Sequence, residues 1–532
     1  MSRTQRGFAA FCVALSLGLP VRARAEDRPI LELSLQEAVA RALEGDVDIA
    51  VARYNPEDSA EAVKQIDGSY EPLLFSTLAK NSTTSPASSA LTGGSKVETN
   101  TFTYNFGVSQ ALKTGGSFRI DFNNNKQDTN SVFTTFNPAF NSSLNLRLGQ
   151  PLVKNLRIDQ TRQLLRIAKK NKEISDLQFV ETVKNTTANV KNLYYDLLYS
   201  MDNLEAQRKS LSLAQKLLGE NQIKVRVGTM APLDVVAAES EVASREENVI
   251  VAEAALADAE DALRQALFPL SDSHTWNLRI VPTDRPTAEP VPVDVEAAVK
   301  KALDSRTDVV NLRKRLENAD ISLQFTKNQL LPQVDLVAAY GAAGLGGTQL
   351  RDASGQPLPQ PITGGYGDAV SDVFGRDFPT WTVGVSLSYP ILNRNAKATS
   401  ARARVARDQT EANVRRLELL VTGEVRSAAR AVESNLKRVQ STRAARVLQE
   451  RRLDAEEKKF AAGMSTNFLV TQAQRDLAVA EVAEVRSVAD YRKSVVNFER
   501  VQEVGVSGVT STATLSSASS TSNRTAGVST QQ

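Results

Sequence analysis

The amino-acid sequence predicts a mixed α and transmembrane β fold. In this fold, an internally duplicated chain continues its barrel strands into long antiparallel α-helical coiled coils. Three observations predict this class. The same order of segments occurs twice, several short runs alternate apolar and polar residues, and two very long stretches repeat apolar residues at heptad spacing. Alternation with period two indicates strands, whereas sustained heptad spacing indicates coiled coils.

The internal repeat is the first of these observations, and repeats of this length change the interpretation of the whole chain. LQEAVARAL at residues 35–43 returns as VEAAVKKAL at residues 295–303. Three further matches follow in the same order: Pro72 and Pro332, residues 150–152 and 389–391, and residues 227–229 and 462–464. A period of roughly 240–260 residues is too long for a solenoid unit, so it indicates a duplicated half-protein.

The repeat divides the chain into five expected parts. They are a signal peptide (1–25), a first structural repeat (26–268), a connector (269–292), a second repeat (293–504) and a disordered Ser/Thr-rich tail (505–532). Barrel strands are expected at about residues 72–150 and 333–389, and long helices at 155–268 and 393–504.

Residues 1–25 have the features of a signal peptide that is removed at about Ala25. Arg3 and Arg6 precede an apolar run of twelve residues (8–19), and Ala23-Arg24-Ala25 fits a small-residue cleavage site. A membrane anchor is the weaker interpretation because a spanning helix needs about 20 apolar residues.

Composition excludes several kinds of function. Cys12, the only cysteine, lies in the signal segment, so the mature chain is expected to have no disulfide and no thiolate chemistry. Without residues 1–25, 60 basic residues face 61 acidic ones, which gives no positive excess to suggest nucleic acid. His274 is the only histidine and has no second His or Cys with which to share a metal. We therefore predict no catalytic residue, cofactor or metal site, and an enzyme is disfavoured.

Six runs read as strands. Four lie in the first half, at residues 74–79, 102–108, 118–122 and 144–148, and two in the second, at residues 334–340 and 381–389. One apolar face and one small or polar face fit a barrel wall between lipid and water, although the half-buried strand of a soluble sandwich has the same pattern. The signal peptide and the lack of an apolar 20-residue run favour an outer-membrane barrel.

The connections between these strands support the barrel. Long polar loops are expected at residues 81–100, 123–141 and 341–379, and a tight turn at residues 113–116. Long loops on one side and short turns on the other are typical of outer-membrane barrels.

Helices are expected on both sides of the strands. A short amphipathic helix at residues 33–44 has Ser34 as N-cap, and the next helix, at residues 46–67, has a candidate break near Pro56. Each half has one very long helix, at residues 155–227 and 396–462, followed after a turn by a shorter one, at residues 233–268 and 467–504. Each shorter helix, stacked end to end with the helix 46–67 or 307–330, would match the length of its long neighbour. Some 70 residues give a rod of about 100 Å.

Each long helix carries a heptad seam. In the first it consists of Val190, Tyr194, Leu197, Met201, Leu204, Leu211 and Leu218, and in the second of Val421, Val425, Ala428, Val432, Val439, Leu453 and Phe460.

On these residues, the chain from about Leu31 to Val504 resembles the TolC-type outer-membrane factors of efflux and type I secretion systems. The duplicated order of elements, the proline before each long helix and the two helix-tip turns carry the resemblance. It implies a homotrimer whose strands close one barrel in the outer membrane and whose helices continue it as a tunnel across the periplasm. The commoner family count is four strands per protomer, whereas the six runs in this sequence favour six. It also implies a periplasmic adaptor (membrane fusion) protein, an inner-membrane pump of the RND, ABC or MFS type, and contact with outer-membrane lipid.

The resemblance further implies that the helix tips contact the adaptor. By position, these residues are Val227, Gly228, Thr229, Met230 and Leu233 in the first tip, and Ala462, Gly463, Met464, Ser465 and Phe468 in the second. The alternative is that they only cap their helices. Leu469 and Gln472 stand where the family often has acidic residues, which departs from its pattern. Asp234, Arg475 and Asp476 remain candidates for a periplasmic gate.

Four functions account for the sequence to different degrees. A passive exit duct for small toxic compounds and the same duct for protein secretion fit the sequence equally well. A structural or adhesive trimeric coiled-coil protein of the cell surface is the alternative from another class, but it would carry one terminal barrel segment rather than strands inside each repeat. An enzyme is the weakest of the four.

Overall fold

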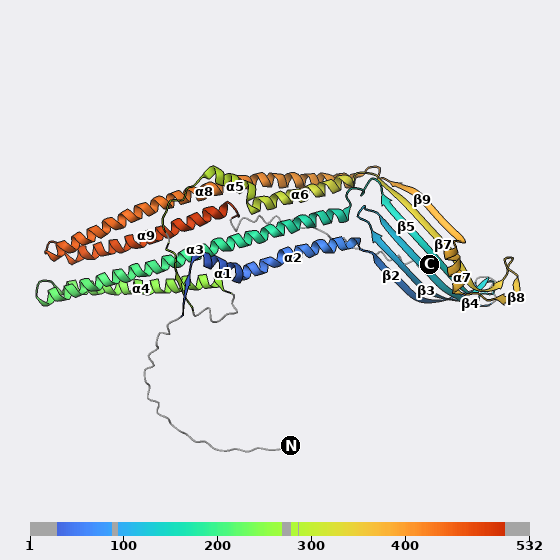
Figure 1. Cartoon of the computed structure of the whole chain (residues 1–532), viewed down its shortest axis with the longest axis horizontal. Helices are drawn as coiled ribbons and strands as arrows, with labels where there is room; N and C mark the ends of the chain where they lie inside the picture. Colours follow the sequence, from blue (N-terminus) through green and yellow to red (C-terminus); the bar gives the residue numbers. More distant parts are fainter. Residues whose placement is uncertain (1–28, 88–93, 269–277, 286, 506–532) are drawn as a thin grey trace, which may run out of the picture.

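The computed structural model describes residues 29–87, 94–268, 278–285 and 287–505. In Figure 1, long helices form one end of the molecule and a curved sheet forms the other. The predictions for the signal peptide (1–25), for His274 and for the tail beyond residue 505 lie outside the described residues. Among the helices described, none is long and apolar enough to cross a membrane.

The sheet contains six long antiparallel strands in the order β2-β3-β4-β5-β7-β9, and the short strand β8 also pairs with β7. The long strands are β2 (Leu73–Pro86), β3 (Lys96–Ala111), β4 (Ser117–Thr129), β5 (Phe136–Pro151), β7 (Gln333–Arg351) and β9 (Phe378–Ser388), and β8 spans Pro357–Ile362. All six predicted runs lie in these strands. In the described chain, β2 and β9 each have one edge without a partner strand.

The predicted long loops were wrong in extent. Most of residues 81–100 and 123–141 belong to strands, with Thr83 paired to Thr99 and Gln127 paired to Ala139. Residues 341–379 contain the upper part of β7, β8 and the helix α7 (Tyr366–Gly375). These strand ends are rich in Asn, Ser and Thr, so they lack apolar alternation although their backbone ladder continues. Alternation reports which face is buried, not whether the ladder is present.

The helices follow the predicted order. The first half contains α1 (Leu35–Gly45), α2 (Val47–Asp67), α3 (Gln160–Arg226) and α4 (Pro232–Leu267), and the second α5 (Val295–Ser305), α6 (Thr307–Asn328), α8 (Arg394–Ala461) and α9 (Asn467–Val501). Ser34 caps α1, as predicted, and the structure adds a capping box with Glu37. The possible break at Pro56 was wrong, because α2 continues through it while packing against α3. A single lost backbone hydrogen bond does not outweigh that packing.

Two rods result from this packing (Figure 1). The α2 and α4 helices lie along α3, and the α6 and α9 helices lie along α8, which is the predicted end-to-end stacking. All seven predicted seam residues of α8 are buried. In α3 the prediction was wrong near the tip. There Ser210, Ala214, Leu217 and Asn221 are buried instead of Leu211 and Leu218, because α3 also packs against α9.

Two buried tyrosines attach the segments between the halves to the rods. β1 (Ile30–Leu33) pairs in parallel with β6 (Arg279–Pro282), and the Tyr194 hydroxyl donates to the Leu33 carbonyl at 3.0 Å. The Tyr491 hydroxyl donates to the Glu289 carbonyl at 2.7 Å. The 3-10 helix η1 (Gly68–Tyr70) leads from α2 into the sheet.

Candidate channel wall, junction and helix tips

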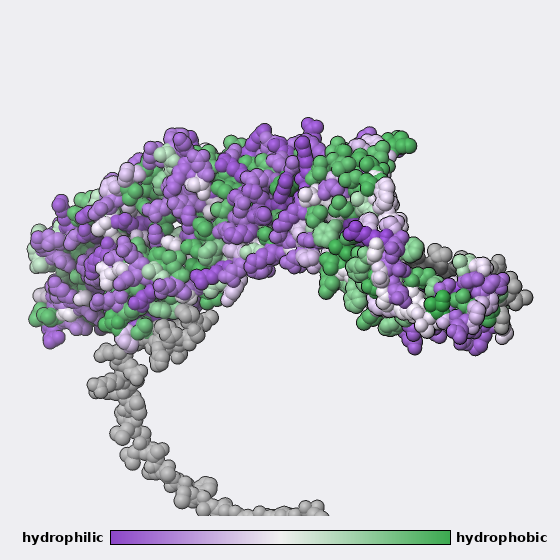
Figure 2. Space-filling model, turned by 45° about the vertical axis from the view of Figure 1, so that its right-hand side comes forward, coloured by the Kyte–Doolittle hydropathy of each residue, from purple (hydrophilic) through white to green (hydrophobic). Residues whose placement is uncertain are grey.

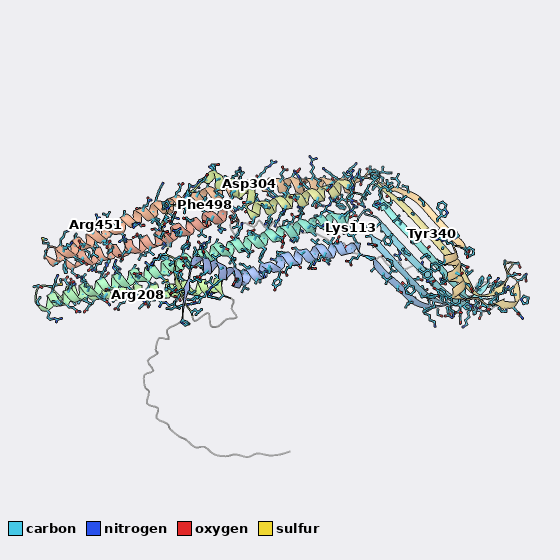
Figure 3. The ribbon with its side chains drawn as sticks, viewed as in Figure 1. Lys113, Arg208, Asp304, Tyr340, Arg451 and Phe498 are labelled. Carbon is cyan, nitrogen blue, oxygen red and sulfur yellow. The ribbon has the colours of Figure 1, made fainter. Side chains whose placement is uncertain are left out.

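One face of the sheet is apolar across its whole width, and we call it the outward face. The register aligns one residue from each long strand in a row: Leu74, Val108, Ile120, Leu146, Tyr340 and Trp381. Leu74 and Trp381 at the two ends of the row are 74% and 73% exposed. Figure 2 shows hydrophobic side chains gathered over the part of the sheet next to the helices, and Figure 3 labels Tyr340 there. A monomeric soluble protein rarely exposes so wide an apolar surface.

The opposite face of the same strands is polar. Arg119, Asp121, Asn145 and Arg147 occupy its central rows, and Arg119 Nε donates to Asp121 Oδ1 at 2.8 Å. The Arg119 guanidinium also lies over the Phe75 ring, 4.4 Å from its centroid. An apolar face towards lipid and a hydrated face towards a lumen are the two requirements of a barrel wall that encloses water.

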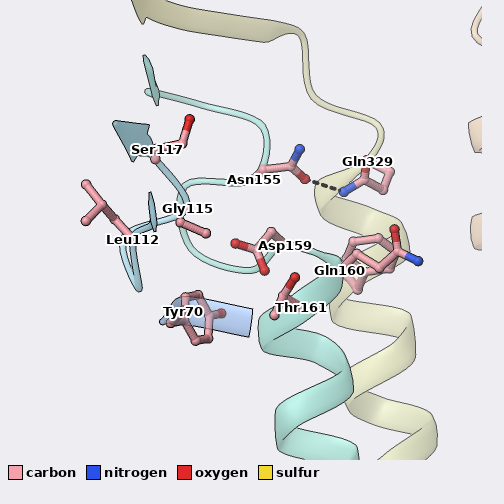
Figure 4. A pocket seen from close by; sticks show the side chains of 12 residues that line it. Tyr70, Leu112, Gly115, Ser117, Asn155, Asp159, Gln160, Thr161 and Gln329 are labelled. Carbon is pink, nitrogen blue, oxygen red and sulfur yellow. Dashed lines mark hydrogen bonds between the residues drawn. The ribbon is translucent and has the colours of Figure 1, made fainter. Parts of the chain in front are cut away.

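The junction between sheet and helices is held by the segment that precedes α3. Arg162 Nη1 donates to the Leu156 carbonyl at 2.8 Å and its Nε donates to Asp159, which also caps α3. Gln329 donates to Asn155 at 2.7 Å and so ties α6 to this segment (Figure 4). These contacts surround a cavity of about 360 Å³ that Tyr70 lines from η1. Lys113, from the β3–β4 turn, lies at this end of the sheet (Figure 3).

The two helix tips are built in the same way, each as a Schellman turn. In the first, Thr229 N–H donates to the Lys224 carbonyl at 2.9 Å and Gly228 has φ +80°. In the second, Met464 N–H donates to the Lys459 carbonyl at 2.8 Å and Gly463 has φ +76°. A positive φ is the conformation that glycine adopts without strain.

The tips expose apolar side chains. Val227, Leu233, Met464 and Phe468 are 67%, 78%, 74% and 70% exposed. Thr229, Gly228, Ala462 and Gly463 are exposed as well, whereas Met230 packs against the core near the tips and Ser465 donates to Glu456 at 2.8 Å. Met230 and Ser465 therefore face partly into the rods, while the other predicted residues form the tip surface.

Polar contacts join the two hairpins near their tips. The Asn221 amide of α3 donates to the Asn467 side chain of α9 at 2.8 Å, and both residues are buried. Asn467 also donates to the Asp234 carbonyl at 3.3 Å. Because buried amides that lack partners are costly, this pair fixes how the hairpins meet.

The three gate candidates do not form one cluster. Arg475 of α9 binds Glu241 of α4 through Nε at 2.9 Å, which links the two hairpins. Asp476 binds Arg452 of α8 at 2.8 Å, within its own hairpin. Asp234 lies in the first turn of α4 and takes part in the hairpin contact through its backbone.

Glu241 is the centre of this arrangement, and its side chain is 7% exposed. Arg245, one turn further along α4, contacts it at 2.8 Å, and Arg475 reaches it from the other hairpin. Burial works to raise the pKa of Glu241, but the hydrogen bond from Arg475 and the charges of both arginines outweigh it and hold the pKa below its usual value. Glu241 is therefore ionised at neutral pH.

Sequence reasoning missed Glu241, Arg245, Asn221 and Asn467. The spacing of Glu241 and Arg245 is a visible signal, since residues four apart share a helix face. Asn467 follows the second tip directly. The partners across the hairpins, Arg475 for Glu241 and Asn467 for Asn221, lie more than 200 residues away along the chain, so only the structure identifies these links. The described residues contain no group of three His, Cys, Asp or Glu side chains that could hold a metal ion.

The comparison with protein families gives one match. The sequence profile of the outer membrane efflux proteins matches residues 119–267 and 298–501 of this chain. The outer membrane protein TolC of Vibrio cholerae serotype O1 is 20% identical over 334 residues, which cover 63% of this chain and 71% of that one.

Solved structures show the same fold. The outer-membrane channel OprN superposes with a TM-score of 0.62 at 15% identity, over 88% of this chain and 90% of that one. CusC gives 0.62 at 13% identity, over 90% and 93%. The open state of the MtrE outer membrane channel of Neisseria gonorrhoeae gives 0.60 at 15% identity, over 88% and 89%. These similarities confirm the predicted class, in which a sheet of barrel strands continues into long antiparallel helices.

Proposed function

The chain belongs to the outer membrane efflux protein family, and from this premise we propose that it is one subunit of a trimeric exit duct. The duct crosses the outer membrane as a barrel and continues through the periplasm as a tunnel of helices. The observation that carries the proposal is the sheet itself, whose apolar outward face and polar inner face continue directly into two rods of about 100 Å.

The unpaired edges of the sheet support the trimer. β2 and β9 have free edges in the described chain, and lipid offers no hydrogen-bonding partner for an exposed strand edge. Three copies, each with six long strands, close a barrel of 18 strands when β2 of one protomer pairs with β9 of the next. Closure then satisfies both edges at once.

A duct of this kind is passive, so the energy for transport comes from a partner. We propose an inner-membrane pump of the RND, ABC or MFS type, coupled through a periplasmic adaptor protein. The exposed tip residues support the adaptor contact, because Leu233, Met464 and Phe468 present apolar surface beyond the last turn of each hairpin. An apolar group at such a tip is stabilised by a partner that covers it.

Glu241 and Arg475 are proposed to keep the tunnel mouth closed. Their link joins the two hairpins of one protomer, and Asn221 with Asn467 adds a second contact nearer the tip. Opening requires the hairpins to separate, which leaves the Glu241 carboxylate without Arg475. Engagement of the tips by the adaptor supplies free energy for that separation.

Small toxic compounds and secreted proteins remain two possible cargoes of the same duct. The polar lumen, with Arg119, Asp121 and Arg147 on its wall, admits hydrated solutes of both kinds. The two roles differ in the pump, so the pump that co-purifies with the duct distinguishes them.

Two measurements test the proposal. The protein extracted from outer membranes should run as a trimer and give small, mostly closed conductance in a planar bilayer. Since Cys12 is the only cysteine and lies in the signal segment, single cysteines at Met464 or Phe468 should cross-link to a periplasmic protein, whereas one at the exposed Leu448 of α8 should not. A soluble monomer would refute the duct and favour the structural coiled-coil alternative.

A further inference from the structure

The outward face of the sheet carries charged side chains at the end furthest from the helices. Counting along the strands, Lys80 and Lys126 lie six residues beyond Leu74 and Ile120 and therefore on the same face. The register places them in one row with two phenylalanines, in the order Lys80, Phe102, Lys126 and Phe140. We call this row the distal row. Two cations thus stand at the outer margin of an apolar surface.

The helix α7 covers part of the outward face beside this row. It packs on β7 at Gly344 and Gly346, where a Cβ would lie 1.9 Å from the Ala369 carbonyl oxygen and 2.2 Å from that of Gly365. These glycines therefore allow a helix to lie flat on the sheet. At its C-terminal end, Phe374 is 68% exposed and contacts Phe122 at a centroid distance of 6.3 Å. Figure 1 shows α7 against the distal part of the sheet.

Tyr366, the first residue of α7, joins the helix to the distal row. Its ring lies 5.4 Å from that of Tyr104 and 6.2 Å from that of Phe140. Its hydroxyl donates to Asn124, which is 1% exposed and belongs to the outward face. The helix thereby covers the Asn124 side chain and supplies a hydrogen bond to its oxygen. Aromatic rings and lysines consequently form one connected surface.

The geometry points to a binding site on this surface for a glycolipid of the outer leaflet that carries two phosphates on its head group. This assignment rests on the proposed function, because that function places the distal row at the outer surface of the membrane. Lys80 and Lys126 are two strands apart, or about 10 Å, which suits two phosphates on one head group better than a single phosphate. The rings of Phe102, Tyr104 and Tyr366 offer flat apolar surface to sugars between them.

Asp128 limits the affinity of the site for a lipid phosphate. Its carboxylate lies 3.5 Å from Lys126 Nζ and is the next outward residue along β4, so it competes with a lipid phosphate for the lysine. Lys80 is exposed on β2 and has no ion pair in the described chain. Removal of the Asp128 charge should therefore strengthen lipid binding, whereas removal of the lysines should weaken it.

The test uses the full-length trimer in detergent, incubated with bisphosphorylated lipid A, with its monophosphorylated form or with phosphatidylglycerol. Native mass spectrometry then measures the lipid retained. The unmodified protein should prefer the bisphosphorylated form. The double variant Lys80→Gln/Lys126→Gln should lose about thirtyfold in retention, since each lysine near anionic lipid contributes roughly fivefold. Asp128→Asn should increase retention.

Lys113→Gln is the matched control, because Lys113 is an exposed lysine at the opposite end of the same sheet. Equal retention by the double variant and the unmodified protein, equal loss in Lys113→Gln, or equal retention of phosphatidylglycerol would each overturn the assignment. Conductance recorded on the same samples separates the two proposals. A conducting trimer without lipid preference refutes only the glycolipid site, whereas failure to insert refutes the duct.

Discussion

The sheet and the helical rods differ in where they place their apolar side chains. In the rods, Val190, Tyr194 and Leu197 are fully buried within one chain. In the sheet, Trp381, Val383 and Val385 are more than 60% exposed, and two strand edges have no partner among the described residues. The rods therefore bury an apolar core within one chain, whereas the sheet leaves its outward face exposed. An apolar face of this width needs cover from lipid or from another protein surface.

The largest loss of stability is expected from a substitution in the core of the rods. Leu197→Ala removes a fully buried side chain and should lower the free energy of unfolding by about 2–5 kcal/mol. The control is Leu448→Ala, where the side chain is 63% exposed and the change should be within about 0.5 kcal/mol. Denaturant unfolding followed by helical circular dichroism measures both. Equal effects would mean that the rods are not packed as described.

A second prediction breaks the outward face of the sheet. Val383→Lys should cost about 2–4 kcal/mol because a lysine faces the lipid core. Thr382→Lys, on the opposite face of the same strand, should cost far less because it enters water. Folding into lipid vesicles at increasing urea measures the difference. If the two variants behave alike, the assignment of the faces is incorrect.

The link at the tips responds to pH in a defined direction. The pKa of Glu241 lies below its usual 4.5, chiefly because the arginines outweigh burial. The stabilisation from this ionised carboxylate is therefore complete above pH 4.5 and is lost as pH falls through the lowered value. Conductance recorded at a series of pH values should stay low at pH 7 and pH 5.5, and a rise from Glu241 should begin only below pH 4.5. Opening already at pH 6 would implicate another group.

The smallest effects separate glycines that turn the chain from glycines that do not. Gly228→Ala should cost about 1–2 kcal/mol because its φ is +80°. Gly219→Ala, inside α3 with nothing within 4 Å of the added Cβ, should gain about 0.5–1 kcal/mol. Thermal unfolding of the pair checks the sign. A cost at both positions would argue against the helical surroundings described for Gly219.

The repeats and periodicities predicted most of this fold. Ser34 predicted the start of α1, and the α8 seam was correct at every position. The alternation of apolar and polar residues did not predict the strand ends furthest from the helices in β2 to β5, because neither face is apolar there. The heptad pattern also failed in α3 beyond Leu204, because there α3 packs against α9 of the other hairpin as well as against α4.

Less of the candidate site than of the fold could be predicted from the sequence. The tip turns follow from local chemistry, since a glycine after a long helix predicts a Schellman turn. The hairpin link does not, because Glu241 and Arg475 meet only through the packing of α4 against α9. The adaptor contacts at both tips stay predictions. The signal peptide and the tail beyond residue 505 also stay predictions, since they lie outside the described residues.

Single-channel recording of one variant tests the central claim, that a closed duct is held at its tips. Glu241→Gln should raise the open probability and conductance of the trimer in a planar bilayer, because Arg475 then loses its charged partner on the other hairpin. Asp476→Asn, which disturbs a pair within one hairpin, should leave the recordings unchanged. A trimer that inserts and conducts equally in all three forms would contradict closure at this link.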